Sequence, residues 1–323
     1  MIRRTLRLFV RLAVSTALTG YLLWKSHPRA VLAAAAGADW RLIGVAVVLV
    51  LADRAFMAYR WVVLLWTMDP VDRPPLAAVI RIFLVSTFVG TFLPASVGGD
   101  AVRAYAIAKL NVPGGDAVAS VFMDRMLGVA SLLVMALGGM LVLRDLADNP
   151  TIVAALGLAT TACAVTLLLI FSGRTASAAS RLLMKLPGAL RRAGEPVLVS
   201  IRRYARYHRQ LANVLACSIA VQTLRIIQAY YLGRGLGVEA SVGVYFAFVP
   251  LILLVMLLPV TFNGIGTSQA AFVWFFARAG VPAATSFALS VLFVSLGVVG
   301  NLPGGFLWAA DRRGHGRQRP RLP

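Results

Sequence analysis

Two apolar stretches of this chain break off in the same way, each at a Leu-Pro pair followed by a glycine-rich turn. The first has the sequence FLPASVGGD at residues 92–100, and the second has LLPVTFNGIG at residues 257–266. Proline removes a backbone donor and clashes with the preceding helical turn, while glycine permits backbone angles that other residues avoid. Each stretch is therefore expected to interrupt a helix. The residues expected to make the breaks are Pro94, Gly98, Gly99, Pro259, Gly264 and Gly266.

An interrupted helix is costly in lipid, and this chain has the composition of a membrane protein. Hydrophobic residues make up 59% of its 323 residues and charged residues only 14%, which is too apolar for an ordinary soluble domain. Inside a bilayer, freed backbone groups are tolerated only where protein or a water-filled cavity satisfies them. A pair of breaks in corresponding places therefore predicts a polar site within the membrane.

Apolar runs close to the roughly 20 residues that a membrane-spanning helix needs predict an all-α, polytopic integral membrane protein. The candidate spans lie near residues 6–24, 42–67, 76–93, 117–143, 151–171, 211–233, 242–259, 266–280 and 284–309. The runs that end at Leu93 and begin at Gly266 are short enough to enter the membrane and turn back. We therefore expect seven to nine membrane helices, including two interrupted or re-entrant segments.

The distribution of Lys and Arg predicts the orientation, because cytoplasmic loops carry an excess of both. The connection at 172–210 and the tail at 311–323 are strongly basic, so both are expected in the cytoplasm, together with the N-terminus. The segment 76–110 must then leave and re-enter the cytoplasmic side, which makes it a re-entrant hairpin on parity alone. We expect a single membrane domain, residues 1–323, in a bacterial inner membrane. Its parts are an N-terminal half at about 1–150, a C-terminal half at 211–310 with the second break at 257–270, and the two basic segments.

The basic connection at 172–210 has two interpretations. Pro187-Gly188 and Gly194-Glu195-Pro196 divide it into two possible short helices, which would lie in the interface with their arginines facing anionic head groups. An ordinary basic cytoplasmic loop explains the same composition. The net charge of +20 does not indicate nucleic acid as a partner, because the basic residues lie mostly between apolar runs.

Ionisable residues inside spans are expensive, so each is a candidate site residue with a structural alternative. Asp53 and Arg60 share one face of a predicted helix but lie about 10 Å apart along its axis, so each needs a partner on another helix. Ser218, Gln222 and Arg225 form one polar stripe on a second helix, where a planar guanidinium suits phosphate. The structural alternative is an ion pair of that guanidinium with a buried aspartate, at position 53 or 124.

Both breaks also bring polar side chains. Arg103 follows the first break at the start of the returning helix, where freed amides and the helix dipole favour anions. Arg125, beside Asp124, either extends to the interface or contacts phosphate. The second break contributes neutral donors and acceptors, with Asn263 and Gln269 among them. The two breaks would thus bound a polar cavity that is cationic on one side and hydrogen-bonding on the other.

The sequence shows little that indicates catalysis or metal binding. The three histidines lie in connections or the tail, and both glutamates lie in loops. No metal-ligand cluster, Ser-His-Asp constellation or phosphate loop is evident, so we expect neither a metal nor a cofactor. We also expect that the protein is not an enzyme.

Several short motifs occur in a fixed order along the chain. They are Tyr59-Arg60-Trp61, the segments 92–104 and 119–125, Leu258-Pro259 with Gly264-Ile265-Gly266, and Gly280-Val281-Pro282. In order and spacing they resemble the flippase-like transmembrane region of lysylphosphatidylglycerol synthases, over about residues 40–309. The chain looks like a stand-alone member of that family, without the aminoacyl-transferase domain of full-length synthases.

The resemblance implies translocation of a modified phospholipid between leaflets, with re-entrant helices around a head-group cavity. By position, Arg60, Arg103 and Arg125 match the family's basic motif residues. The second break departs from the family, which commonly has a Pro-Gly-Gly-x-Gly run and a following Glu where this chain has Gln269. Because a neutral amide stabilises an ammonium group less than a carboxylate does, the departure argues against a cationic aminoacyl head group.

The leading hypothesis is a flippase-like protein that moves a phosphate-bearing lipid, either a phospholipid or an aminoacyl-phospholipid, between leaflets. The expected partners are therefore membrane lipids, anionic or phosphate-bearing. The residues expected to bind them are Arg60, Arg103, Arg125, Gln222, Arg225, Asn263 and Gln269. One alternative is a transferase on a polyprenyl-phosphate carrier, with Asp100 or Asp124 as base. The other is a non-catalytic membrane partner that docks a separate lipid- or envelope-modifying enzyme through the connection at 172–210.

Overall fold

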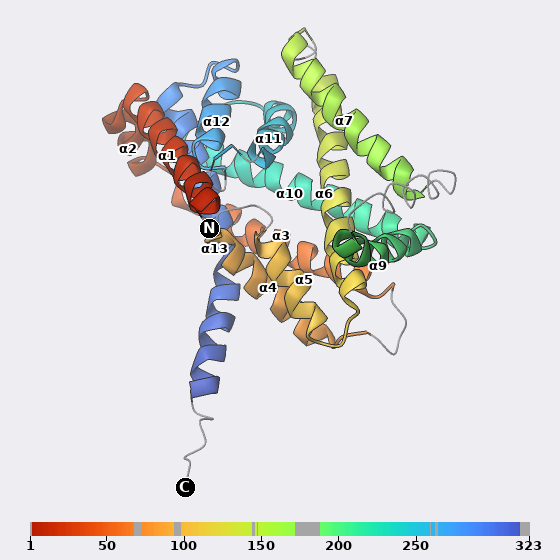
Figure 1. Ribbon diagram of the computed structural model, residues 1–323. Helices are drawn as coiled ribbons and strands as arrows, with labels where there is room; N and C mark the ends of the chain where they lie inside the picture. Colours follow the sequence, from red (N-terminus) through yellow and green to blue (C-terminus); the bar gives the residue numbers. More distant parts are fainter. Residues whose placement is uncertain are drawn as a thin grey trace.

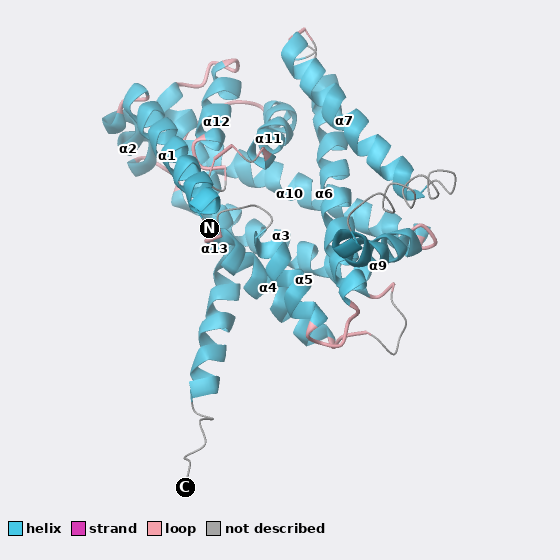
Figure 2. Ribbon diagram, in the orientation of Figure 1, coloured by secondary structure: helices cyan, strands magenta, loops and turns pink. Residues whose placement is uncertain are grey.

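Helices make up the described part of this protein. The computed structural model describes residues 2–67, 73–93, 98–143, 146, 148–171, 188–258, 260–261 and 264–316. Within these ranges the long regular elements are all helical (Figure 2), which confirms the predicted all-α fold.

The helices follow the predicted apolar runs, and all nine predicted spans coincide with one (Figure 1). Their bounds are α1 (Ile2–Lys25), α2 (Pro28–Ala36), α3 (Trp40–Leu65), α4 (Leu76–Thr91), α5 (Gly98–Ala108), α6 (Gly114–Val142), α7 (Pro150–Phe171), α9 (Gly188–Tyr204), α10 (His208–Gly235), α11 (Val242–Leu257), α12 (Thr267–Ala277) and α13 (Ala283–Gly316).

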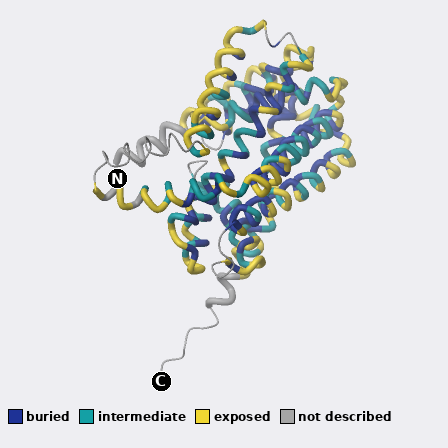
Figure 3. The backbone as a smooth tube through the Cα atoms, turned by 90° about the vertical axis from the view of Figure 1, so that its right-hand side faces the viewer, coloured by how far each residue is buried: buried dark blue, intermediate teal, exposed yellow. Residues whose placement is uncertain are grey.

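Five of the described helices are long and apolar enough to cross a membrane, namely α3, α6, α7, α10 and the Ala283–Ala310 part of α13. Buried residues gather between the helices, and exposed residues cover their outer faces (Figure 3). Many exposed residues are large and apolar, such as Leu141 and Leu158, which are 79% and 75% exposed. Outer faces of this kind suit hydrocarbon rather than water. The protein is a multi-pass membrane protein.

Each sequence break is the turn of an antiparallel helical hairpin, α4–α5 at the first and α11–α12 at the second. Each hairpin joins an arm of 16 residues to an arm of 11. Phe83 of α4 shares a core cluster with Ile107 of α5, and the ring of Tyr245 in α11 contacts that of Phe276 in α12. At about 1.5 Å per residue, the arms reach about 24 and 17 Å, short of the roughly 30 Å of hydrocarbon. Both breaks therefore turn the chain back.

The two turns use glycine for different reasons. Gly264 and Gly266 have φ angles of 77° and 95°, so the expected need for unusual backbone angles is confirmed there. Gly98 and Gly99 instead begin α5 with helical geometry, and the same expectation is wrong for them. A Cβ on Gly99 would lie 2.9 Å from the Ser86 carbonyl oxygen. Glycine in the first break therefore permits close contact between the two arms.

The helix quartet α3–α6 recurs as α10–α13. Each quartet consists of a long helix, arms of 16 and 11 residues and a second long helix, and α4 packs on α13 as α11 packs on α6. The sequences agree with this arrangement. Val112-Pro113 and Leu127-Gly128-Val129 of the first quartet recur as Val281-Pro282 and Leu296-Gly297-Val298 of the second. The fold thus contains a structural repeat, with one hairpin in each copy.

The two copies are inverted relative to each other. Helices α3 and α10 occupy the same place in their quartets, and they pack against one another. Arg60 contacts Ser218 whereas Asp53, earlier on α3, contacts Arg225, later on α10, so the two helices are antiparallel. In membrane transporters, such inverted repeats place the binding site at the interface between the copies.

Helix α9 differs from the sequence prediction, in which Pro187-Gly188 and Gly194-Glu195-Pro196 divide two short helices. The helix runs unbroken from Gly188 to Tyr204 with Pro196 inside it, while the first of the predicted pair lies outside the described residues. Packing explains the continuity, because Pro196 lies directly against Gly115 of α6. The Tyr204 hydroxyl donates to the Leu64 carbonyl at 3.2 Å, and burial raises the pKa of that hydroxyl. These contacts hold α9 against the bundle.

Candidate functional site

A cavity of about 570 Å³ lies between the two hairpins and is bounded by α3, α6, α10 and α13. Thr91 and Gly99 line it from the first hairpin, and Leu258 and Gly264 line it from the second. The charged residues of the lining are Asp53, Arg54, Arg60, Asp100, Arg103, Asp124, Arg125 and Arg225. The pair of breaks thus encloses a polar site, as the sequence predicts.

Asp124 organises the first group of charges, which we call the Asp124 cluster: Arg60, Asp100, Arg103, Asp124 and Arg125. The Asp124 carboxylate accepts from Arg60 Nε at 2.6 Å and from Arg103 Nη2 at 3.1 Å. The Asp100 carboxylate lies 3.3 Å from Arg103 Nη2 and 2.5 Å from Arg125 Nε. Arg125 is about half exposed, while the side chains of Arg60 and Arg103 are buried. The first break, α3 and α6 thus meet in one ionic network.

Aromatic and polar neighbours complete the Asp124 cluster. The Arg103 guanidinium lies 4.9 Å from the ring centroid of Trp61 and 5.6 Å from that of Phe83. Arg60 Nη1 donates to the Ser218 hydroxyl at 2.9 Å. Cation–π contacts and charge-assisted hydrogen bonds of this kind offset part of the desolvation cost of buried arginines. The predicted need of Arg60 for a partner on another helix is therefore met by α6 and α10.

The second group, the Asp53 cluster, contains Asp53, Arg54, Met57 and Arg225. Asp53 Oδ2 accepts from Arg54 Nη1 at 2.8 Å, and Asp53 Oδ1 lies 3.3 Å from Arg225 Nε. Of the two structural pairs that the sequence allowed for Arg225, the pair with Asp53 is formed. Met57 Sδ accepts from Arg54 Nη1 at 3.3 Å and from Arg225 Nη2 at 3.2 Å. The sequence prediction missed Arg54, although a second charge beside Asp53 in an apolar run was a usable signal.

Both clusters carry more positive than negative charge. The Asp124 cluster sets three guanidinium groups against two carboxylates, and the Asp53 cluster sets two against one. With all of these groups ionised, each cluster has a surplus of one positive charge. A buried charge that lacks a full complement of counter-ions attracts an anion strongly.

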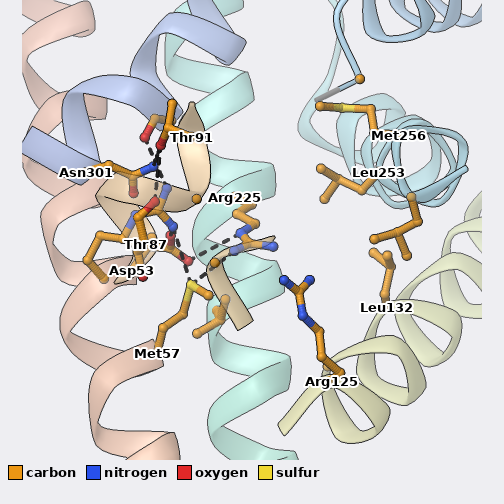
Figure 4. A pocket seen from close by; sticks show the side chains of 18 of the residues that line it. Asp53, Met57, Thr87, Thr91, Arg125, Leu132, Arg225, Leu253, Met256 and Asn301 are labelled. Atoms are coloured by element: carbon orange, nitrogen blue, oxygen red, sulfur yellow. Dashed lines mark hydrogen bonds and ion pairs between the residues drawn. The ribbon is translucent and has the colours of Figure 1, made fainter. Parts of the chain in front are cut away.

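The cavity also has one polar and one apolar wall (Figure 4). Thr87, Thr91, Asp53 and Asn301 lie together on one side, where Asn301 Nδ2 donates to the Thr91 hydroxyl at 2.8 Å. The opposite side is formed by apolar side chains of α6 and α11, namely Leu132, Leu253 and Met256. A site with these two walls matches an amphipathic molecule better than a free polar solute.

Most of the predicted binding residues meet in this cavity. Its lining includes Arg60, Arg103, Arg125, Gln222 and Arg225. The Gln222 amide donates to the Gly128 carbonyl at 3.4 Å, and its buried Oε1 atom has no hydrogen-bond partner. The structure therefore brings together five residues from helices that are distant in sequence.

The remaining predicted residues are not part of the described lining. Asn263 lies outside the described residues, as do Pro94 and Pro259. Gln269 is buried, and its Oε1 accepts from the Gly266 backbone at 2.6 Å and from the Ser268 hydroxyl at 2.9 Å. The Gln269 side chain thus caps the start of α12, which satisfies a backbone donor that has no partner within the helix.

The two repeats contribute equivalent positions to the cavity. On α3 and α10, Asp53, Arg54, Met57 and Arg60 have the same spacing as Val221, Gln222, Arg225 and Gln228. On α6 and α13, Asp124, Arg125, Gly128, Val129 and Leu132 have the same spacing as Phe293, Val294, Gly297, Val298 and Asn301. Nearly all the charge therefore comes from the first repeat, and Arg225 is the exception.

The comparison with known families agrees with this architecture. No curated protein matches the chain. The family model described as "Lysylphosphatidylglycerol synthase TM region" matches residues 8–304, which is most of the chain and includes every residue that lines the cavity. The match also begins earlier than the resemblance seen in the sequence and takes in most of α1. The chain belongs to the lysylphosphatidylglycerol synthase transmembrane-region family.

Proposed function

We propose that the protein moves a phosphate-bearing lipid between the two leaflets of a membrane. One observation carries the proposal, the presence of surplus arginine charge and an apolar wall in the same cavity. The guanidinium groups would hold the phosphate, because they offer paired donors that match its oxygens. The apolar wall would lie against the glycerol region and the first part of the acyl chains.

The hairpins support transport because they lower the cost of moving a charge through hydrocarbon. A lipid phosphate that crossed about 30 Å of bare hydrocarbon would be unpaired and desolvated, which is very unfavourable. Between the hairpins it would meet arginines instead. We further propose that the termini and the connection at 172–210 face the cytoplasm of a bacterial inner membrane, since these segments are basic. The movement would be either facilitated exchange down the lipid's own gradient or transport coupled to an ion gradient.

A transferase using Asp100 or Asp124 as base fits the geometry less well. Each of these carboxylates already contacts two arginines, so few lone pairs remain to take a proton from a substrate. A docking partner would act through the basic connection, in which α9 is held against α6 by the 3.4 Å pair of Arg203 with Asp116. Transport is the function that makes use of the cavity itself.

The test is transbilayer movement of labelled lipid in proteoliposomes. With fluorescent phosphatidylglycerol, the wild-type protein should accelerate exchange, and Arg225→Gln should slow it by about ten-fold or more, as expected for loss of a charge-assisted contact. Arg225 is the best choice because Asp53 keeps Arg54 as a partner. Arg203→Gln, outside the cavity lining, is the matched control. Wild-type protein that leaves exchange unchanged for phosphatidylglycerol and for polyprenyl phosphate would contradict the proposal.

A further inference from the structure

We infer that the Asp53 cluster is a separate binding site for a lipid phosphate, midway along the path and distinct from the Asp124 cluster. This inference rests on the proposed function, because a lipid path through the protein exists only if the protein moves lipid. The groups that would bind the phosphate are the guanidinium groups of Arg54 and Arg225. Met57 would be the group that the phosphate displaces.

The contacts of Met57 provide the first argument. Two guanidinium N–H groups, one from Arg54 and one from Arg225, donate to its sulfur at 3.3 and 3.2 Å. A thioether is a weak acceptor, whereas a hydrogen bond from a guanidinium to a charged oxygen is among the strongest in proteins. A phosphate oxygen in the position of the sulfur would therefore replace two weak hydrogen bonds with two strong ones. Figure 4 shows the Met57 sulfur on the side of the cavity where Asp53 and Arg225 lie.

The inverted repeat provides the second argument. Met57 and Arg225 occupy equivalent positions on α3 and α10, and they contact each other. Two equivalent residues of an inverted pair meet only near the axis that relates the copies. In inverted-repeat transporters this axis lies in the membrane plane, and the central site lies on it. The Asp53 cluster is therefore at the middle of the path.

Spacing separates this site from the Asp124 cluster. Asp53 and Arg60 are seven residues apart on α3, and so are Arg225 and Ser218 on α10, the residues that they contact. At 1.5 Å per residue, both helices therefore place the Asp53 cluster about 10 Å from the Asp124 cluster along the helix axis, and we call these two positions levels. The oxygens of one phosphate lie only a few ångströms apart, so it cannot bind at both levels at once. A lipid would pass from one cluster to the other.

Charge indicates the class of lipid. The Asp53 cluster has a surplus of one positive charge, which one phosphodiester with a single negative charge would balance. Buried donors without a partner also line the cavity nearby, Arg54 Nε on α3 and Gln228 Nε2 one turn beyond Arg225. Both remain available to phosphate oxygens other than the one that replaces the sulfur.

The test compares opposite charge changes at the Asp53 cluster. Asp53→Asn raises the surplus to two charges, so the half-saturating phosphatidylglycerol fraction for exchange should fall by about ten-fold while the maximal rate also falls, because release becomes slower. Arg225→Gln removes the surplus, so the half-saturating fraction should rise and exchange should be slower. Asp116→Asn, in an ion pair outside the cavity lining, should change neither quantity. Half-saturation that stays unchanged in both variants, or that moves in the same direction in both, would overturn the inference, because opposite charge changes at a phosphate site must shift its affinity in opposite directions.

Met57→Leu provides a second measurement with a variant that keeps charge and volume. In detergent, short-chain phosphatidylglycerol should raise its melting temperature more than that of the wild type. The reason is that the N–H groups of Arg54 and Arg225 that donate to the Met57 sulfur would have no acceptor there until the phosphate binds. A smaller or equal increase would overturn the inference. Wild-type protein that shows these binding effects without exchange would remove the proposed function alone. Exchange that does not respond to Asp53 or Arg225 would remove only the central site.

Discussion

The two repeats share an architecture but differ in chemistry at the same positions. Arg103 and Phe272 occupy the same place in α5 and α12, and Asp124 and Phe293 the same place in α6 and α13. In the first repeat the two residues form an ion pair at 3.1 Å, and in the second their ring centroids lie 5.5 Å apart. One backbone arrangement thus supports a charged contact in one copy and an aromatic contact in the other.

This difference gives the cavity two unlike ends. Because the repeats are inverted, the two equivalent pairs lie on opposite sides of the level where Met57 meets Arg225. The aromatic pair belongs to the large core cluster that α10–α13 share with α3, α6 and α7, where Phe272 also stacks on Phe276. The charged pair therefore lies at one end of the site and the aromatic pair at the other.

The largest predicted effect tests the charged contact. Asp124→Ala should lower the free energy of unfolding by about 3–5 kcal/mol, because Arg60 and Arg103 would remain buried after losing the carboxylate that they share. Denaturation in mixed detergent micelles measures the change. Asp116→Ala is the control, and a loss of only about 1 kcal/mol or less is expected because its partner Arg203 is partly exposed. Equal losses in the two variants would show that the Asp124 cluster contributes no more than a surface pair.

The next prediction tests close contact in the first hairpin. Gly99→Ala should cost about 1–3 kcal/mol, because the new Cβ would meet the Ser86 backbone at 2.9 Å and force the arms apart. Gly138→Ala, in the interior of α6 with no atom within 4 Å of the new Cβ, should instead stabilise by about 0.5–1 kcal/mol. Melting temperatures in detergent would show the opposite signs. A neutral Gly99→Ala would mean that the hairpin arms are not held at this distance.

A smaller effect tests the equivalence of the repeats themselves. Gly280 and Asn111 precede the Val-Pro pairs of the two copies and have positive φ angles of 74° and 64°. Gly280→Ala should cost about 1 kcal/mol, whereas Gly280→Asn should cost less, because asparagine tolerates this backbone region. The first repeat already uses asparagine at this place. If the two variants melt at the same temperature, the correspondence does not extend to this turn.

Much of the fold was predictable because each helix is local and apolar. The nine predicted spans follow from run length alone, and the first hairpin followed from parity. Helix α9 was not predicted as one unit, since Pro196 indicates a break and only its packing on Gly115 explains continuity. The repeat was also missed as a whole. The sequence prediction paired only the two Leu-Pro breaks, although Val-Pro and Leu-Gly-Val also recur in the same order in the two halves.

The candidate site was predictable in its residue types but not in its pairings. Arg60, Arg103 and Arg225 were predictable as site residues because they lie in or beside apolar runs, where a buried charge is costly. Which acid each one meets depends on how helices far apart in sequence pack, and no local pattern records that. Met57 carried no signal at all, since a methionine in an apolar helix is ordinary. Its contacts with two guanidinium groups appear only in three dimensions.

The smallest predicted effect concerns Gln269, where the sequence comparison and the structure lead to different conclusions. The family commonly has Glu there, and its loss argued against a cationic head group. In the structure the side chain instead accepts from Gly266 and Ser268 at the start of α12. A carboxylate accepts the same two hydrogen bonds and is favoured by the helix N-terminus, which offsets part of its burial cost. Gln269→Glu should therefore change the free energy of unfolding by no more than about 1 kcal/mol.

Head-group selectivity is the measurement that decides between these conclusions. Proteoliposomes that contain phosphatidylglycerol and lysylphosphatidylglycerol would be compared for the wild type and for Gln269→Glu. We expect the same ratio of exchange rates in both, because Gln269 is not among the cavity-lining residues. Gln269→Leu, which removes the acceptor, is the control and should cost about 1–3 kcal/mol of stability while leaving the same selectivity. A shift of Gln269→Glu towards the lysyl lipid would place this side chain in contact with the head group and would make the second hairpin a second recognition element.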